Sequence, residues 1–276
     1  MDFLNSARPS PIAGTWYSDD PTRLASEMNA FIKKAHLSDD EFAGEVFGLV
    51  APHAGHVYSG RTAGYAYRTI KGLQRDLVVI FSPFHQYHTA DVVTTAFDTY
   101  VTPLGKVPVE TQLLNQLNDV IPLHQVQHDP EHAIEIQIPF LQCALEGEFS
   151  LLPLMVRTRD AKQLKAIAEQ LMKLIKTESF LMIASTDLSH FHSLDIAQQL
   201  DAEMLRRIKA MDGDAVLAAE REGSASACGA SSVAMLLYAA SRQKGSRTYI
   251  LNYSTSAEVT GDTSSVVGYG AAAIYI

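Results

Sequence analysis

The 276-residue sequence has few cysteines, a deficit of positive charge and no long apolar run. Its two cysteines, Cys143 and Cys228, do not provide the paired spacing of a disulfide-rich secreted domain. Lysine and arginine total 22 against 31 acidic residues, and the net charge of −9 argues against binding to nucleic-acid backbones. No apolar stretch is long enough to cross a bilayer, and Met1–Ser10 lacks the pattern of a secretory signal. We therefore expect a cytoplasmic protein that binds neither nucleic acid nor membrane.

Short apolar runs alternate with amphipathic stretches of helical length along the whole chain. This alternation is typical of α/β proteins in which helices flank a central sheet. No repeat and no Pro-, Gly- or Ser-rich linker divides the sequence, so we expect residues 1–276 to form a single domain. Two strands near the C-terminus favour a mixed, mostly parallel sheet. The main predicted strands are Val46–Ala51, Leu77–Ser82, Phe149–Val156, Phe180–Ser185, Thr248–Tyr253 and Ser265–Ile276.

Histidine-bearing loops follow three of these strands. His53 follows the first strand, His85 follows the second, and Asp187 and His190 follow Phe180–Ser185. Because ligands of open α/β sheets bind beyond the carboxyl ends of the strands, these side chains should converge at one rim if the strands are parallel neighbours. A lone buried histidine is more often a hydrogen-bonded core residue than a ligand. Three histidines at equivalent strand ends favour a metal or acid–base site.

A fourth group of polar residues lies on a predicted helix, Glu131–Leu145, which Pro139 should kink or divide. His132 and Glu135 are three residues apart, and Glu131 and Glu135 are four apart, so all three could share one face of that helix. Such a face could supply a metal ligand, a general base or carboxylates that orient ligating imidazoles. The alternative is a structural helix N-terminus that is capped by Asp129.

Cys228 immediately precedes a predicted helix at Ser231–Ser241. A helix N-terminus lowers the pKa of a thiol and favours the thiolate, which is the form that binds metals. The alternative is a small buried residue, the usual fate of a free cysteine. We assign that structural role to Cys143, which lies in an apolar helical pattern.

A Ser-His-Asp hydrolase is a further interpretation, because Ser185, Asp187 and His190 all occur in one loop. The chain lacks a G-x-S-x-G elbow, and close neighbours in one loop rarely form triad geometry. The glycines around His53 do not match dinucleotide or P-loop spacing either. Both interpretations are therefore disfavoured.

Taken together, these segments resemble the Memo family, known in prokaryotes as AmmeMemoRadiSam system protein B. The resemblance covers nearly the whole chain, and its motifs occur in family order. They are GTWY at 14–17, APHAG at 51–55 with YSG at 58–60, SPFH at 82–85, EHAIEIQIPFL at 131–141, STDLSH at 185–190 and ACG at 227–229. The resemblance implies the fold of class III extradiol dioxygenases, the LigB-like enzymes that use non-haem iron.

The resemblance also implies that His53, His85 and Cys228 are metal ligands and that Asp187 and His190 line the same pocket. Dioxygenases of this class bind iron through two histidines and a carboxylate. A thiolate as third ligand is a departure that suits iron(II), our first expectation, as well as copper or zinc. Ring-cleaving activity therefore does not follow from the fold alone.

Three functions remain open at this point. The first is an iron- or copper-dependent redox or dioxygenase-related protein in which His190 acts in acid–base chemistry and Asp187 orients it. The second is a non-catalytic module whose retained pocket binds a small molecule or a peptide, and the family name implies radical SAM and AMMECR-type proteins as partners. The third is a zinc-dependent hydrolase with Glu135 or His190 as base.

Overall fold

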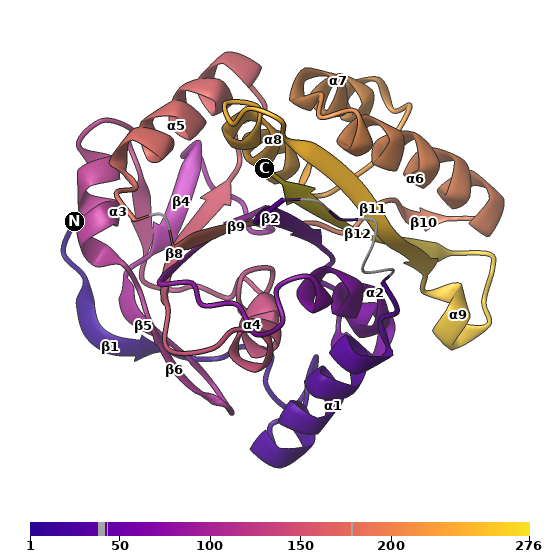
Figure 1. Ribbon diagram of the computed structural model, residues 1–276, viewed down its shortest axis with the longest axis horizontal. Helices are drawn as coiled ribbons and strands as arrows, with labels where there is room; N and C mark the ends of the chain where they lie inside the picture. Colours follow the sequence, from indigo (N-terminus) through magenta and orange to yellow (C-terminus); the bar gives the residue numbers. More distant parts are fainter. Residues whose placement is uncertain (38–41, 43, 178) are drawn as a thin grey trace.

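The computed structural model describes residues 1–37, 42, 44–177 and 179–276. Four short apolar strands form the centre of its larger sheet. In spatial order they are β2 (Val46–Ala51), β9 (Phe180–Ser185), β3 (Leu77–Ser82) and β8 (Ser150–Val156). All three pairings among them are parallel. Helices cover both faces of these strands, which explains why they are apolar runs without polar alternation (Figure 1).

Further strands extend this sheet on both sides. Next to β2 lies β12 (Val266–Tyr275), which is antiparallel to it and also pairs with β10 (His190–His192) and β11 (Arg247–Thr255). Next to β8 lies the antiparallel β4 (Val92–Thr95), which pairs in parallel with β7 (His124–Val126). The predicted α/β architecture with a mixed sheet is confirmed, and each antiparallel pairing of this sheet involves at least one strand other than the four central ones.

A small second sheet contains β1 (Leu4–Arg8), β5 (Phe97–Thr102) and β6 (Gly105–Pro108). The chain reverses between β5 and β6, where Thr102 pairs with Gly105. Gly105 has a φ of 133°, a backbone conformation that other residues rarely adopt. Strand β1 pairs in parallel with β5, and this pairing attaches the N-terminal segment to the small sheet.

The helices form two layers around the larger sheet (Figure 1). One layer contains α1 (Pro21–Lys34), α2 (His56–Arg68) and α4 (Ile138–Ala144). The other contains α5 (Ala161–Leu174), α6 (Leu194–Lys209), α7 (Gly213–Glu222) and α8 (Ala230–Ala240). Two further helices are α3 (Thr111–Asn118) and α9 (Ala257–Thr260). Every residue of α8 is buried, because this apolar helix packs between the sheet and α5 and α7.

The predicted helix over Glu131–Leu145 is wrong in its first part. The chain forms a single 3₁₀ turn at Glu135–Gln137, and α4 begins only at Ile138 with Pro139 in its first turn. Proline is well suited to a helix start, since its missing N–H has no partner there. Before that turn, the Glu131 carboxylate accepts hydrogen bonds from the following backbone N–H groups and holds a non-helical conformation. His132 and Glu135 therefore do not share a helix face.

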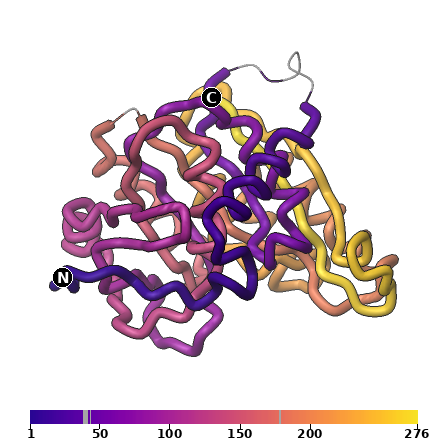
Figure 2. Tube along the Cα trace, turned by 90° about the horizontal axis from the view of Figure 1, so that it is seen from below, coloured from indigo at the N-terminus to yellow at the C-terminus, as the bar shows by residue number. Residues whose placement is uncertain are grey.

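The carboxyl ends of the central strands meet at one edge of the sheet. Ala51 at the end of β2 pairs with Ser185 at the end of β9, and Phe81 of β3 pairs with Ala184. The N-terminal strand lies on one side of the molecule, and the turn between β11 and β12, with α9, lies on the opposite side (Figure 2). Within the described residues, no helix combines the length and the apolar character that crossing a membrane requires.

Candidate metal centre

His53 follows β2 and is held from two directions. Its Nδ1 lies 3.1 Å from the Ser185 hydroxyl, and its backbone N–H donates to Asp187 Oδ1 at 2.7 Å. Its Nε2 lies 3.1 Å from Cys228 Sγ. Burial, helped by the neighbouring His85, lowers the pKa of His53 to about 3. The imidazole is therefore neutral at physiological pH, which is the form that binds a metal.

Glu131 orients two further imidazoles. Its Oε1 lies 3.0 Å from His85 Nδ1 and 3.3 Å from His132 Nδ1, and its Oε2 accepts the His85 backbone N–H at 2.6 Å. The two rings stack with centroids 4.7 Å apart. Because each Nδ1 faces the carboxylate, the Nε2 of each ring makes no hydrogen bond with the described residues. Carboxylates that hold the second nitrogen of a histidine are typical of metal-ligating imidazoles.

Charge supports the same arrangement. Although burial opposes the shift, the hydrogen bond with His85 lowers the pKa of Glu131 to about 2, so this group is a carboxylate. Burial opposes protonation of His85 as well, yet the hydrogen bond with Glu131 raises the pKa of His85. Burial, followed by repulsion from His53, lowers the pKa of His132 to about 4. Two of the three histidines are thus neutral, and the third is paired with an anion.

The three histidines form the candidate metal centre. Each of His53, His85 and His132 offers one nitrogen, and these nitrogens all lie within 4.8 Å of one another. Ring centroids are 5.3 Å apart for His53 and His85, and 5.4 Å apart for His53 and His132. Imidazole nitrogen is a ligand for iron, copper and zinc alike. The donor set therefore fits a transition-metal ion without selecting its element.

Residues 8–273 of the chain match a family model described as Memo-like protein. The chain belongs to the Memo family. Relatives include a MEMO1 family protein of Nitrosopumilus maritimus, which is 30% identical over 96% of this chain and 98% of its own length. A second, from Thermoplasma acidophilum, is 33% identical over 95% of this chain and 96% of its own. A third, from Archaeoglobus fulgidus, is 32% identical over 94% and 95%.

Cys228 lies beside the histidine cluster of this Memo family protein, which is formed by His53, His85 and His132. It is in the loop before α8, and its sulfur also accepts the Asp187 backbone N–H at 3.3 Å. Burial, followed by the charge of Asp187, raises the pKa of the thiol and outweighs the lowering effect of the backbone N–H of Gly229 at the start of α8. Cys228 is not among the residues whose potential ligand atoms all lie within 4.8 Å of one another. Its role as a metal ligand stays a prediction.

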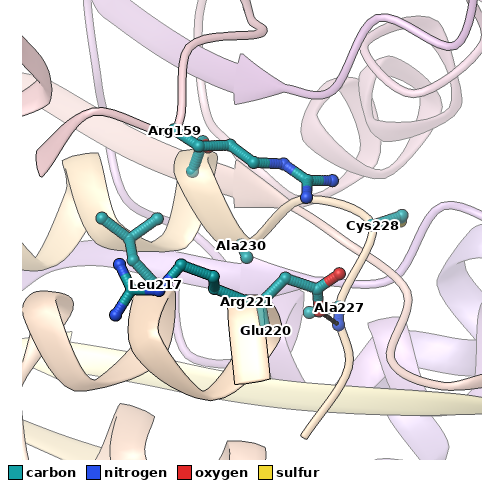
Figure 3. A pocket seen from close by; sticks show the side chains of 8 residues that line it. Arg159, Leu217, Glu220, Arg221, Ala227, Cys228 and Ala230 are labelled. Atoms are coloured by element: carbon teal, nitrogen blue, oxygen red, sulfur yellow. Dashed lines mark hydrogen bonds between the residues drawn. The ribbon is translucent and has the colours of Figure 1, made fainter. Parts of the chain in front are cut away.

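Cys228 also lines a small cavity of about 80 Å³ (Figure 3). Arg159, Glu220 and Arg221 surround this space. Glu220 accepts the backbone N–H of Ala227 at 2.8 Å and so fixes the residue next to the cysteine. The small cavity is therefore a consequence of how α7 and the loop before α8 meet.

A much larger cavity, of about 690 Å³, opens over the three histidines. Asp187 and His190 both line it, as expected. Among the described residues, the hydrogen bonds that the Asp187 carboxylate accepts come from the backbone of His53 and Ala54, so this side chain anchors the first histidine loop. Burial raises the pKa of Asp187. Orientation of His190 by Asp187, and the acid–base role of His190, stay predictions.

A buried charge network supports the segment that carries Glu131 and His132. Arg8 of β1 donates to Asp129 Oδ2 at 2.7 Å, to the Glu135 carboxylate and to the backbone carbonyl of Glu131. Tyr17 donates to Glu135 Oε1 at 2.6 Å. Glu135 is thus engaged with Arg8 and Tyr17 and does not line the large cavity. That Glu135 lies beside the ligating imidazoles stays a prediction, since its described hydrogen bonds join it to other residues.

Glu131 is one of the carboxylates that the sequence offers for orienting imidazoles, and it contacts two histidines, although not from the helix face that was expected. Sequence reasoning missed one residue that shapes the site. Trp16, the single tryptophan of the chain, packs against His132 with ring centroids 4.3 Å apart. The one available signal for Trp16 was its place in the motif GTWY.

Proposed function

We propose that this Memo family member binds one transition-metal ion, iron(II) in the first place, and uses it in redox or dioxygenase-related chemistry. The ion would be held by His53, His85 and His132, with the Cys228 sulfur as an additional donor next to His53. The observation that carries the proposal is the set of three imidazole nitrogens within 4.8 Å of one another at the edge of the large cavity. Copper and zinc are the alternatives that the same donors would accept.

The bound metal would supply redox chemistry and open coordination positions for a small molecule. The protein would supply orientation. Glu131 fixes two imidazoles, and the Ser185 hydroxyl, itself a hydrogen-bond acceptor for Gln137, fixes the third. His190 lines the cavity without belonging to the donor set, and it is our candidate for moving a proton to or from a bound molecule.

The metal proposal is tested by anaerobic reconstitution. Purified protein is stripped with chelator, loaded with iron(II), copper(I) or zinc, and analysed for bound metal. We expect one ion per chain in the wild type, and loss of uptake in the His53→Ala/His85→Ala double variant. His36→Ala, which changes an exposed histidine after α1, is the matched control and should bind normally. Absence of uptake by the wild-type protein for every metal would refute the proposal.

Cobalt(II) substitution tests the contribution of Cys228. A thiolate bound to cobalt(II) gives a charge-transfer band in the near ultraviolet, and imidazole ligands do not. If Cys228 is a ligand, the wild type has this band and Cys228→Ser lacks it. A visible cobalt spectrum without that band would assign the ion to the histidines alone.

A second candidate function rests on the rim of the cavity. Trp16, Tyr58 and Phe191 line the cavity and are 36%, 42% and 76% exposed. Phe191 also has a φ of 62°, a strained conformation that is characteristic of functional sites. Exposed aromatic side chains around a cavity favour binding of an organic molecule or a peptide. We propose this binding role, without turnover, as the alternative.

The alternative has its own test. Radical SAM and AMMECR-type proteins are the partners to try first, together with peptides that carry aromatic residues. Capture that is equal for the wild type and for the His53→Ala/His85→Ala variant would support binding that is independent of metal. Capture that is lost with the histidines would count against it.

A further inference from the structure

The ring of Tyr269 in β12 is buried, but its hydroxyl makes no hydrogen bond with the described residues and is not fully enclosed by them. The residue is 2% exposed and lines the large cavity. Buried tyrosine hydroxyls usually find a partner, and several do so in this chain. They are the hydroxyls of Tyr17, which donates to Glu135, of Tyr67, which donates to Gln137, of Tyr100, which donates to Asp129, and of Tyr238, which donates to Asp214.

The strand fixes the direction of this side chain. Gly268 exchanges two backbone hydrogen bonds with the loop after β9, donating to the Ser189 carbonyl at 2.9 Å and accepting from Leu188 N–H at 2.8 Å. A side chain at Gly268 would collide with Asp201 of α6. Since successive residues of a strand point to opposite faces, Tyr269 points away from α6 and into the cavity.

The phenol also lies among groups that keep it protonated. Burial, followed by the charges of Asp187 and Tyr58, raises the pKa of Tyr269. Both of those residues line the same cavity, so the polar end of Tyr269 is on the cavity side. The hydroxyl is therefore available as a hydrogen-bond donor throughout the physiological range of pH.

No lysine or arginine is among the described residues that line this cavity, whereas Asp187 and Asp262 are. A ligand with a free negative charge would therefore meet no lysine or arginine among the described residues of the cavity wall. The ligands that fit are neutral molecules, or anions whose charge a bound metal neutralises. An acceptor atom on such a ligand needs a neutral hydrogen-bond donor, and the Tyr269 hydroxyl is such a donor in the cavity wall.

We propose that the Tyr269 hydroxyl donates a hydrogen bond to the ligand that occupies the cavity next to the histidine cluster. The ligand class is a small molecule with an oxygen or nitrogen acceptor that is neutral or is neutralised by coordination. This proposal rests on the proposed metal centre, and it adds a ligand-binding residue from a strand that supplies no metal ligand.

The test uses azide as probe with full-length protein loaded with cobalt(II). Azide coordinates through one end and offers a nitrogen acceptor to nearby donors. We compare the wild type with Tyr269→Phe, and use Tyr249→Phe as matched control, because Tyr249 packs against Phe42 and Tyr275 outside the cavity. Cobalt uptake is measured first, and the azide dissociation constant is then measured from the visible spectrum.

We expect equal cobalt uptake in all three proteins and azide binding that is roughly 10- to 100-fold weaker in Tyr269→Phe, as for loss of a hydrogen bond to a charged group. The infrared stretching band of bound azide should also shift in that variant only. Equal azide affinity and an unshifted band would overturn the proposal, as would a cobalt-loaded wild type that does not bind azide. A wild type that takes up no cobalt refutes the metal centre itself, which is a separate result.

Discussion

Replacing Glu131 by glutamine tests how the imidazoles are held. The two oxygens of Glu131 accept from the backbone N–H groups of His85, His132 and Ala133, and they also face Nδ1 of both histidines. Glutamine has the same shape, but one of its two terminal atoms is a donor. Either orientation of the amide places this NH₂ against a donor of His85 or His132. The variant therefore cannot accept from all of the backbone and imidazole donors that hold His85 and His132.

The size of the effect depends on how many ligating imidazoles Glu131 orients. Removing the outer partner of a ligating histidine weakens metal binding about 10- to 100-fold, or ~1.4 to 2.7 kcal/mol. Because Glu131 serves two of the three histidines, we expect the Glu131→Gln variant to lie near the upper end, at about 100-fold. Loss of the negative charge acts in the same direction, since the carboxylate partly neutralises a bound cation.

The assay uses the single tryptophan of the chain. Trp16 packs against His132, so a paramagnetic ion in the cluster should quench its fluorescence. Titration with cobalt(II) then gives the dissociation constant of the wild type, of Glu131→Gln and of Glu169→Gln, a surface carboxylate on α5 that serves as control. A folded Glu131→Gln variant that binds cobalt(II) as tightly as the wild type would refute the orienting role.

Three further predictions concern charge and stability. Burial lowers the pKa values of His53, His56 and His132 to about 3, 4 and 4. Below pH ~6.5 the unfolded chain therefore takes up more protons than the folded chain at these imidazoles. In urea denaturation of metal-free protein, the free energy of unfolding should fall by up to ~1.4 kcal/mol per pH unit for each imidazole, down to pH ~4. The raised pKa of His85 partly offsets this fall. Arg8→Met leaves two buried carboxylates without their cation and should cost ~3–5 kcal/mol in the same assay, whereas a change under ~1 kcal/mol would contradict the network. Cys228→Ser should retain histidine-bound metal but lose the cobalt–sulfur band, and a band that persists would exclude Cys228 as its source.

The central strands could be predicted from sequence because their environment leaves a strong pattern. β2, β3 and β9 are buried on both faces, so each is a continuous apolar run with the bounds expected from sequence. Parallel pairing then brings the loops after these strands to one edge. This rule was sufficient to place His53 and His85 near each other, with centroids 5.3 Å apart.

The third histidine of the cluster could not be positioned in the same way. The spacing of His132 and Glu135 predicted a shared helix face, but the helix starts later, at Ile138. His132 is oriented instead by Glu131, whose other partner, His85, is 46 residues away in the chain. Side-chain contacts of this range leave no local pattern. The same is true of Cys228, for which burial against the loop after β9 outweighs the effect of the following helix on the pKa of the thiol.

The pairing of β2 has a consequence for how the protein is made. This strand, complete by residue 51, has β9 and β12 as its neighbours, and β12 ends at residue 275. During synthesis β2 therefore leaves the ribosome long before either neighbour exists, with both of its hydrogen-bonding edges open. Such apolar edges are prone to misassociation. A nascent chain of this protein is thus expected to depend on chaperone protection until its C-terminal strand emerges, when the segment that carries Tyr269 closes the sheet.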